Sequence, residues 1–175
     1  VNAFSLDGAD NVTIDGRFNG SGRYLRFVTS NTSASTFRFV NDARGNTITY
    51  CIIEGTNSSS TDGVIEFSTT SGANGNDNNT ISNCLIRDVS GTTPQNMIYS
   101  SGSTTTSATY NSNNTISNNE IYNFYRSGQV CSGLRLEGGT SDWTISGNSF
   151  YQTSTRSTNT ATTYIIIYVN TSNAN

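Results

Sequence analysis

Short apolar segments alternate with polar turns along the whole chain, and the pattern repeats every 29–35 residues. Five segments begin with a threonine that is followed by isoleucine and a polar residue, at Thr13, Thr47, Thr80, Thr115 and Thr144. One apolar residue between two polar ones is the alternation expected of a strand with one buried face. The central residues are therefore predicted to stack inward as an aliphatic ladder: Ile14, Ile48, Ile81, Ile116 and Ile145.

Each repeat holds two further apolar segments. The second segment follows the threonine triplet and contains Phe18, Ile52 with Ile53, Leu85 with Ile86, Ile121 or Phe150. The third covers residues 37–39, 65–67, 97–99, 134–136 and 165–167. β-Branched residues, glycine and asparagine fill the repeats, which disfavours a helical solenoid. The sequence predicts an all-β fold: a right-handed parallel β-helix solenoid of about five coils with three short strands each, in a single domain over residues 1–175.

A second internal column is expected where each threonine strand ends. The positions read Arg17, Cys51, Cys84, Asn119 and Asn148 from coil to coil, and the last four are expected to form the internal column. Asparagine tolerates the left-handed backbone of a corner, and its amide can bond up and down a stack, which we expect of Asn119 and Asn148. Stacked strands lie about 4.8 Å apart, so a disulfide between Cys51 and Cys84 is geometrically possible. Two stacked, buried thiols are the favoured interpretation.

Composition excludes several functional classes. Only 12% of the residues are charged, against about 25% in most globular domains. The chain has no histidine, which rules out histidine acid–base chemistry within it. A net charge of −3 without a basic cluster argues against nucleic-acid binding. No apolar run approaches 18 residues, so no membrane insertion is expected, and three cysteines form no zinc site. No cofactor and no metal site are predicted.

Two repeats resemble a known architecture. Residues 78–86, Asn-Asn-Thr-Ile-Ser-Asn-Cys-Leu-Ile, and residues 113–121, Asn-Asn-Thr-Ile-Ser-Asn-Asn-Glu-Ile, are similar to repeats of pectin-lyase-like right-handed parallel β-helix proteins. Residues 12–20 and 142–153 look like segments of large secreted surface proteins of Bacteroidota, which often carry a type IX secretion signal. The resemblance implies a secreted or cell-surface location and export as type IX secretion cargo. We see no cap at either end, so the chain is expected to be part of a longer one.

Enzymes of this architecture carry motifs that the chain lacks. The Gly-His-Gly motif of the hydrolases is absent, and the only proline, Pro94, does not lie in an Arg-x-Pro-x-x-Arg pattern. The best candidate surface is the outward column of the third strand, predicted as Ser5, Arg38, Glu66, Ile98, Arg135 and Ile166, with Tyr99 as a wall. The predicted binding set is therefore Arg38, Glu66, Tyr99 and Arg135, and no catalytic residue is assigned.

Three functions follow from these observations. The first is a non-catalytic extracellular scaffold, adhesin-like or structural, whose partners are glycans, other surface or secretion proteins, or the rest of its own chain. The second is a carbohydrate-active enzyme, a polysaccharide lyase or glycoside hydrolase, using Glu66 and another carboxylate. The third and weakest is ice binding by the outward hydroxyl pairs of the threonine strands, such as Thr47 with Thr49, although Asp15 breaks the array.

Overall fold

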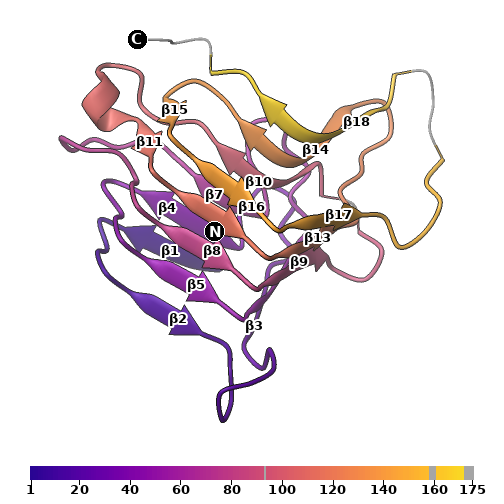
Figure 1. The fold of residues 1–175 in the computed structure, drawn as a ribbon. Helices are drawn as coiled ribbons and strands as arrows, with labels where there is room; N and C mark the ends of the chain where they lie inside the picture. Colours follow the sequence, from indigo (N-terminus) through magenta and orange to yellow (C-terminus); the bar gives the residue numbers. More distant parts are fainter. Residues whose placement is uncertain (93, 158–160, 172–175) are drawn as a thin grey trace.

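The chain passes through three parallel β-sheets in turn, so that each coil adds one strand to each sheet (Figure 1). This arrangement comes from a computed structural model that describes residues 1–92, 94–157 and 161–171. The predicted all-β parallel solenoid of about five coils is confirmed. The helical content of the described residues is one turn of 3-10 helix, Ser107–Thr109, and none of their helices is long enough to cross a membrane.

The strands of each sheet share a position in the repeat. The first sheet holds the threonine triplets, in the order β16 (Thr144–Ser146), β12 (Thr115–Ser117), β8 (Thr80–Ser82), β5 (Thr47–Thr49) and β2 (Thr13–Asp15). The second holds β17 (Ser149–Tyr151), β13 (Glu120–Tyr122), β9 (Leu85–Asp88), β6 (Ile52–Gly55) and β3 (Arg26–Val28). The third holds β1 (Phe4–Asp7), β4 (Phe37–Val40), β7 (Ile65–Phe67), β10 (Asn96–Ser100), β14 (Val130–Leu136) and β18 (Thr163–Val169). A pair of two-residue strands, β11 (Asn111–Ser112) and β15 (Thr140–Ser141), joins two of the corners.

Residues with a left-handed backbone form the corners between the sheets. Before the first-sheet strands this position is taken by Asn11, Gly45, Asn78, Asn113 and Asp142, with φ between 55° and 65°. Asparagine, aspartate and glycine adopt this conformation at the lowest cost, which explains why asparagine recurs at a fixed place in the repeat. The repeated turn residue therefore sets where each coil changes direction.

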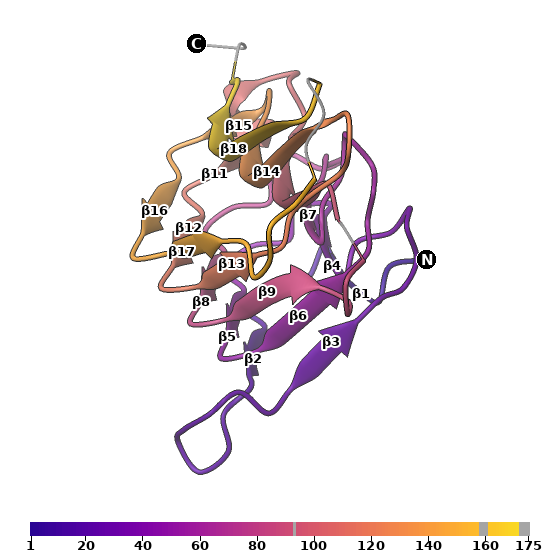
Figure 2. The ribbon, with the colours of Figure 1, turned by 90° about the vertical axis from the view of Figure 1, so that its right-hand side faces the viewer.

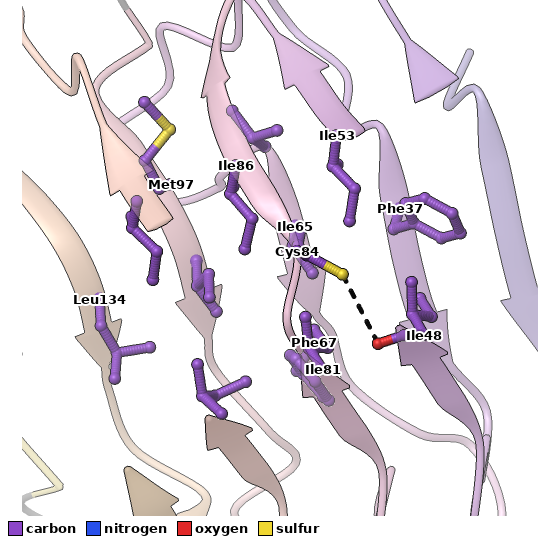
Figure 3. Packing of buried hydrophobic residues seen from close by; sticks show 14 of the residues in the cluster. Phe37, Ile48, Ile53, Ile65, Phe67, Ile81, Cys84, Ile86, Met97 and Leu134 are labelled. Carbon is purple, nitrogen blue, oxygen red and sulfur yellow. Dashed lines mark hydrogen bonds between the residues drawn. The ribbon is translucent and has the colours of Figure 1, made fainter. Parts of the chain in front are cut away.

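The core runs along the axis of the solenoid, inside the three sheets. Figure 3 shows isoleucines of adjacent coils stacked on one another, with Phe37, Phe67 and Leu134 entering from the third sheet. The rings of Phe39 and Phe67 stack with centroids 4.3 Å apart and planes 4° from parallel. Because each strand contributes only one or two inward residues, the core is one side chain deep, and each coil depends on its neighbours for burial.

A column of buried asparagines that we did not predict lines the corner before the first sheet. Asn46 donates its backbone and side-chain N–H groups to Oδ1 of Asn79, at 3.0 and 2.9 Å. Asn79 makes the same pair of bonds to Asn114, at 2.9 and 3.1 Å. All three side chains are buried. Each amide thus satisfies the backbone of the preceding coil, so buried polar groups hold the coils in register rather than weakening the core.

Two sequence predictions about strands are wrong. Phe18 does not start the second strand of the first coil: it lies 64% exposed in an inserted hairpin, bridged to Ser21, and β3 begins only at Arg26. The insertion turns on Asn19, Gly20 and Gly22, all with positive φ, and projects from the first coil (Figure 2). The end of the chain, residues 172–175, was predicted to lack a cap and lies outside the described residues.

The second error concerns which residue of β10 faces outward. We placed Ile98 in the outward column, but Ile98 is fully buried and pairs with Ile65, whereas Tyr99 pairs with Glu66. A shift of one residue moves a side chain to the opposite face of a strand. Ile166 is likewise outside this column, because Tyr168 is the partner of Arg135. In these strands apolar residues occupy both faces, so alternation alone did not fix the register.

Candidate functional site

The third sheet brings the four predicted binding residues together in one line along the solenoid axis. Arg38 is in register with Glu66, Glu66 with Tyr99, and Tyr99 with Arg135. Tyr168 continues the line in the last coil. We call Arg38, Glu66, Tyr99, Arg135 and Tyr168 the axial row. Successive members come from successive coils, so they are separated by the strand spacing of about 4.8 Å.

Ion pairs and a ring contact hold the charged members of the axial row. Nε of Arg38 lies 2.9 Å from Oε2 of Glu66, and Nη2 of Arg38 donates to Oγ of Ser68 at 2.9 Å. Nε of Arg135 donates to Oε1 of Glu137 at 2.6 Å, and its guanidinium lies 4.7 Å from the ring centroid of Tyr168. The arginine side chains keep 35% and 18% of their surface exposed. The row therefore presents pre-positioned donors to solvent.

Glu66 lies beside a second carboxylate. Oγ of Ser35 donates to Oδ1 of Asp62 at 2.6 Å and lies 3.5 Å from Oε2 of Glu66. Burial raises the pKa of Glu66, the nearby negative charge of Asp62 raises it further, and Arg38 opposes both effects. Asp62 also accepts the backbone N–H of Gly63 at 2.7 Å. Sequence reasoning asked for a carboxylate near Glu66 and did not find Asp62, which reaches it from the loop before β7.

Tyr99 is less available than the rest of the row. Its side chain is 6% exposed, and burial raises its pKa, as does the nearby charge of Glu137. The ring therefore forms the floor of the row rather than a free wall. Arg38 on β4 and Arg135 on the neighbouring β14 keep more of their side chains exposed than Tyr99 does.

The predicted internal ladder has the following geometry. Ile48, Ile81 and Ile116 are fully buried, and Ile14 and Ile145, in the first and last coils, are half-buried. Cys51 and Cys84 are buried free thiols, and the N–H of Cys51 points to Sγ of Cys84 at 3.5 Å. Asn119 donates its backbone and side-chain N–H groups to Oδ1 of Asn148, both at 3.0 Å. The four residues of the second column thus share one hydrogen-bonding line, in which sulfur replaces oxygen at Cys84.

A polar cleft on the outer face of the second sheet was missed by sequence reasoning. It has a volume of about 370 Å³, and we call it the arginine cleft. Its lining includes Arg26, Glu54, Arg87, Asp88, Tyr122 and Arg156. These residues come from strands β3, β6, β9 and β13 of the second sheet and from the segment after β17. The second sheet faces the viewer in Figure 2. The outward positions of this sheet are in register, Val28 with Glu54 and Glu54 with Arg87.

The buried carboxylate of Glu54 organises the arginine cleft. Its side chain is 1% exposed and pairs with two arginines. Nε of Arg26 donates to Oε2 at 3.0 Å, and Nε of Arg87 donates to Oε1 at 2.7 Å. Nη1 of Arg87 also donates to the hydroxyl of Tyr122 at 3.3 Å. A buried carboxylate requires such partners, and here they fix both guanidinium groups at the cleft wall.

Stacked tyrosines continue this surface to the last coil. The rings of Tyr122 and Tyr151 have centroids 4.7 Å apart and planes inclined by 17°. The hydroxyl of Tyr151 donates to Oε2 of Glu120 at 3.1 Å, and Nη1 of Arg23 donates to Oε1 of Glu120 at 2.8 Å. The hydrogen bond from Arg23 lowers the pKa of Glu120. Alternation in the second segment would have revealed these outward residues, but placing that strand at Phe18 in the first coil hid Arg26.

The threonine face was the basis of the ice-binding prediction. Its five threonines are in register from coil to coil, Thr13 with Thr47, Thr47 with Thr80, and onward to Thr144. In the companion column Oγ of Ser82 donates to Oγ1 of Thr49 at 3.0 Å, and both side chains are buried. These two hydroxyls therefore bond to each other across the coils. The ice-binding interpretation stays a prediction.

Neither a metal site nor a similar protein identifies a function for this chain. Within residues 1–92, 94–157 and 161–171, no three cysteine or carboxylate side chains gather where they could hold a metal ion. No protein-family model, no curated protein and no solved structure matches this chain. The assignment of binding sites therefore rests on the geometry of the chain itself.

Proposed function

We propose that the chain is a non-catalytic extracellular β-helix scaffold that binds glycans along the axial row. It would serve as an adhesin-like module of a secreted, Bacteroidota-type cell-surface protein exported as type IX secretion cargo. The location and export route rest on the resemblance of residues 12–20 and 142–153 to such proteins. The observation that supports binding is the line of Arg38, Glu66, Tyr99 and Arg135, one residue per coil in a single register.

A linear polymer lying along the axis would meet one side chain of the row about every 4.8 Å. Guanidinium groups donate several hydrogen bonds in a fixed fork, which suits hydroxyl and carboxylate oxygens. Arg38 and Arg135 are held by Glu66 and Glu137, so binding loses little side-chain entropy. Coils stacked in three sheets hold the spacing of these donors, and a rigid scaffold of this kind favours repetitive ligands.

Binding is favoured over catalysis because each charged side chain of the row is already in an ion pair. Glu66 faces Arg38, and Arg135 is paired with Glu137. The chain contains no histidine that could exchange protons near neutral pH.

A glycoside hydrolase is the second candidate, and one observation favours it. Glu66 and Asp62 both lie within 3.5 Å of Oγ of Ser35, and the pKa of Glu66 is raised. A carboxyl with a raised pKa beside a second carboxyl is the arrangement that can divide acid and base roles in glycosidases.

A glycan-array screen with product analysis on the same polysaccharides separates the two functions. Binding without cleavage, weakened at least fivefold by Arg38→Gln and unchanged by Arg17→Gln, is the expected result. Arg17 is a suitable control because it lies in the turn after β2, away from the third sheet, where it pairs with Asp15 and lies over the ring of Tyr50. Cleavage that is abolished by Glu66→Gln would replace the scaffold proposal with the hydrolase. If the chain neither binds nor cleaves any of the glycans, both proposed functions are rejected.

A further inference from the structure

A second cleft adjoins the arginine cleft on the other side of residues 152–156. It has a volume of about 360 Å³, and we call it the aromatic cleft. Its wall is mainly apolar and includes Phe124, Phe150, Tyr151, Tyr164 and Ile166. Ser154 and Arg156 line both clefts, so the two spaces meet at these residues. No member of the axial row lines either cleft, so this site is separate from the proposed glycan surface.

The charge of the arginine cleft is positive. Arg26 and Arg87 share the single carboxylate of Glu54. The carboxylate of Asp88 is already engaged: it accepts the side-chain amide of Asn123 at 2.8 Å and the backbone N–H of Gly91 at 2.9 Å. Three arginines thus face two carboxylates, both of which have hydrogen-bond partners.

Arg156 is the cation at the junction. Its Nε donates to the neutral amide of Gln152 at 3.3 Å, and its guanidinium lies 5.7 Å from the ring centroid of Tyr125. Among the described residues no carboxylate forms an ion pair with it. A half-buried guanidinium without a counter-charge favours an anion, because a charge-assisted hydrogen bond is stronger than a neutral one.

We propose that the two clefts together bind a free carboxylate amphiphile with a single acyl chain, of the medium-chain fatty-acid class. The carboxylate accepts hydrogen bonds from Arg156 at the junction, and Arg87 and Arg26 add positive potential behind it. The acyl chain enters the aromatic cleft, where Phe150, Tyr164 and Ile166 remove it from water. Both parts of the ligand are required: the apolar wall offers little to a small anion, and the arginines favour a charged head group over a neutral one.

Isothermal titration calorimetry with decanoate, below the concentration at which it forms micelles, tests the proposal. Decanoate should bind the unaltered chain at least tenfold more tightly than 1-decanol, which has the same chain and a neutral head group. Butyrate, which has the head group and a short chain, should bind at least tenfold more weakly than decanoate. Equal affinity for decanoate and decanol, or no decanoate binding, would overturn the proposal.

Two variants assign the parts of the site. Arg156→Gln should weaken decanoate binding about tenfold, the loss expected for one charge-assisted hydrogen bond, and should leave decanol binding unchanged. Ile166→Gln, at a side chain that is 54% exposed, should weaken the binding of both decanoate and decanol. Arg17→Gln and Glu66→Gln should leave the binding of decanoate and of decanol unchanged, which separates this site from the axial row. An Arg156→Gln variant that binds decanoate normally would contradict the assigned head-group contact. If a variant fails to fold, the comparison of the three ligands on the unaltered chain still decides the proposal.

Discussion

The backbone N–H of Cys84 donates to the side-chain oxygen of Asn119 in the following coil, at 2.8 Å. This bond is where the asparagine part of the second column meets the cysteine part. Asn119 also donates its side-chain N–H to the backbone oxygen of Ile81 at 2.9 Å, so one amide satisfies two backbone groups of the preceding coil. The buried amide of Asn119 therefore supplies the hydrogen bonds that water would make to these backbone groups on the surface of a protein.

Asn119→Ala should lower the free energy of unfolding by about 3 kcal/mol. The change leaves the N–H of Cys84 buried without this partner and also removes the amide's bond to the carbonyl of Ile81, and a buried group left without a partner costs about 1–3 kcal/mol. Urea denaturation followed by circular dichroism measures the effect. Asn31→Ala in an exposed turn is the matched control and should cost under about 1 kcal/mol. Equal losses of unfolding free energy in the two variants would show that the amide of Asn119 stabilises the fold no more than an exposed turn residue does.

Cys84 should not react with a thiol reagent in the folded chain. The neighbouring thiol of Cys51 and burial of the side chain raise the pKa of Cys84 well above its ordinary value of about 9. Because the thiolate is the reactive species, labelling by iodoacetamide at pH 8 should occur only after unfolding in denaturant. Mass spectrometry of peptides labelled with and without denaturant measures this. Rapid labelling of Cys84 in the native chain would mean that the column opens readily.

Arg87→Gln should cost about 2 kcal/mol of stability. It removes one of the two cations that face the buried carboxylate of Glu54. The expected loss is smaller than the roughly 3–5 kcal/mol of a fully buried pair, because Arg87 keeps 38% of its side chain exposed and Arg26 remains. Arg17→Gln, which breaks the exposed pair with Asp15, should have no measurable effect on the denaturation midpoint. A loss from Arg17→Gln as large as that from Arg87→Gln would contradict this difference.

Glu66 should make the folded chain less stable as the pH rises above the ordinary glutamate value of about 4.5. Its pKa is raised in the fold, so just above this pH the folded chain still holds a proton that the unfolded chain has lost. Stability therefore falls as pH rises through that window, and Glu66→Gln should remove this part of the slope. Glu120→Gln is an opposite control: the pKa of Glu120 is lowered, so its contribution is present above about 4.5 and is lost as pH falls.

Denaturation midpoints measured in steps of half a pH unit for the unaltered chain and both variants check the two signs. An unchanged slope in Glu66→Gln would mean that burial of this carboxylate has no energetic effect.

The repeat made the architecture predictable, because the Thr-Ile triplets carry both the period and the strand alternation. The buried asparagines at Asn46, Asn79 and Asn114 were present in the same pattern, one residue before each threonine. No inward role was predicted for them, since composition does not tell an inward amide from an outward one. Their hydrogen bonds became visible only when the coils were stacked.

The candidate sites were predicted unevenly. Arg38, Glu66, Tyr99 and Arg135 were named from the sequence, although Ile98 was placed outward in error, because β10 is apolar on both faces. Asp62 and the arginine cleft were missed for a different reason. Asp62 comes from a loop, and loop positions have no period. The inserted hairpin displaced β3 by several residues, which hid the alignment of Arg26 with Ile52, from where its side chain reaches Glu54.

The parallel stacking of coils also determines how the molecule would respond to mechanical force. Hydrogen bonds between coils run along the solenoid axis, and the strands of the first sheet pair with the strands one repeat away. Tension applied along the axis would load these bonds one coil at a time instead of shearing a whole sheet at once. Each detached coil would release about 33 residues, or about 115 Å of extended chain. The solenoid would thus behave as an extensible tether that lengthens in nearly equal steps.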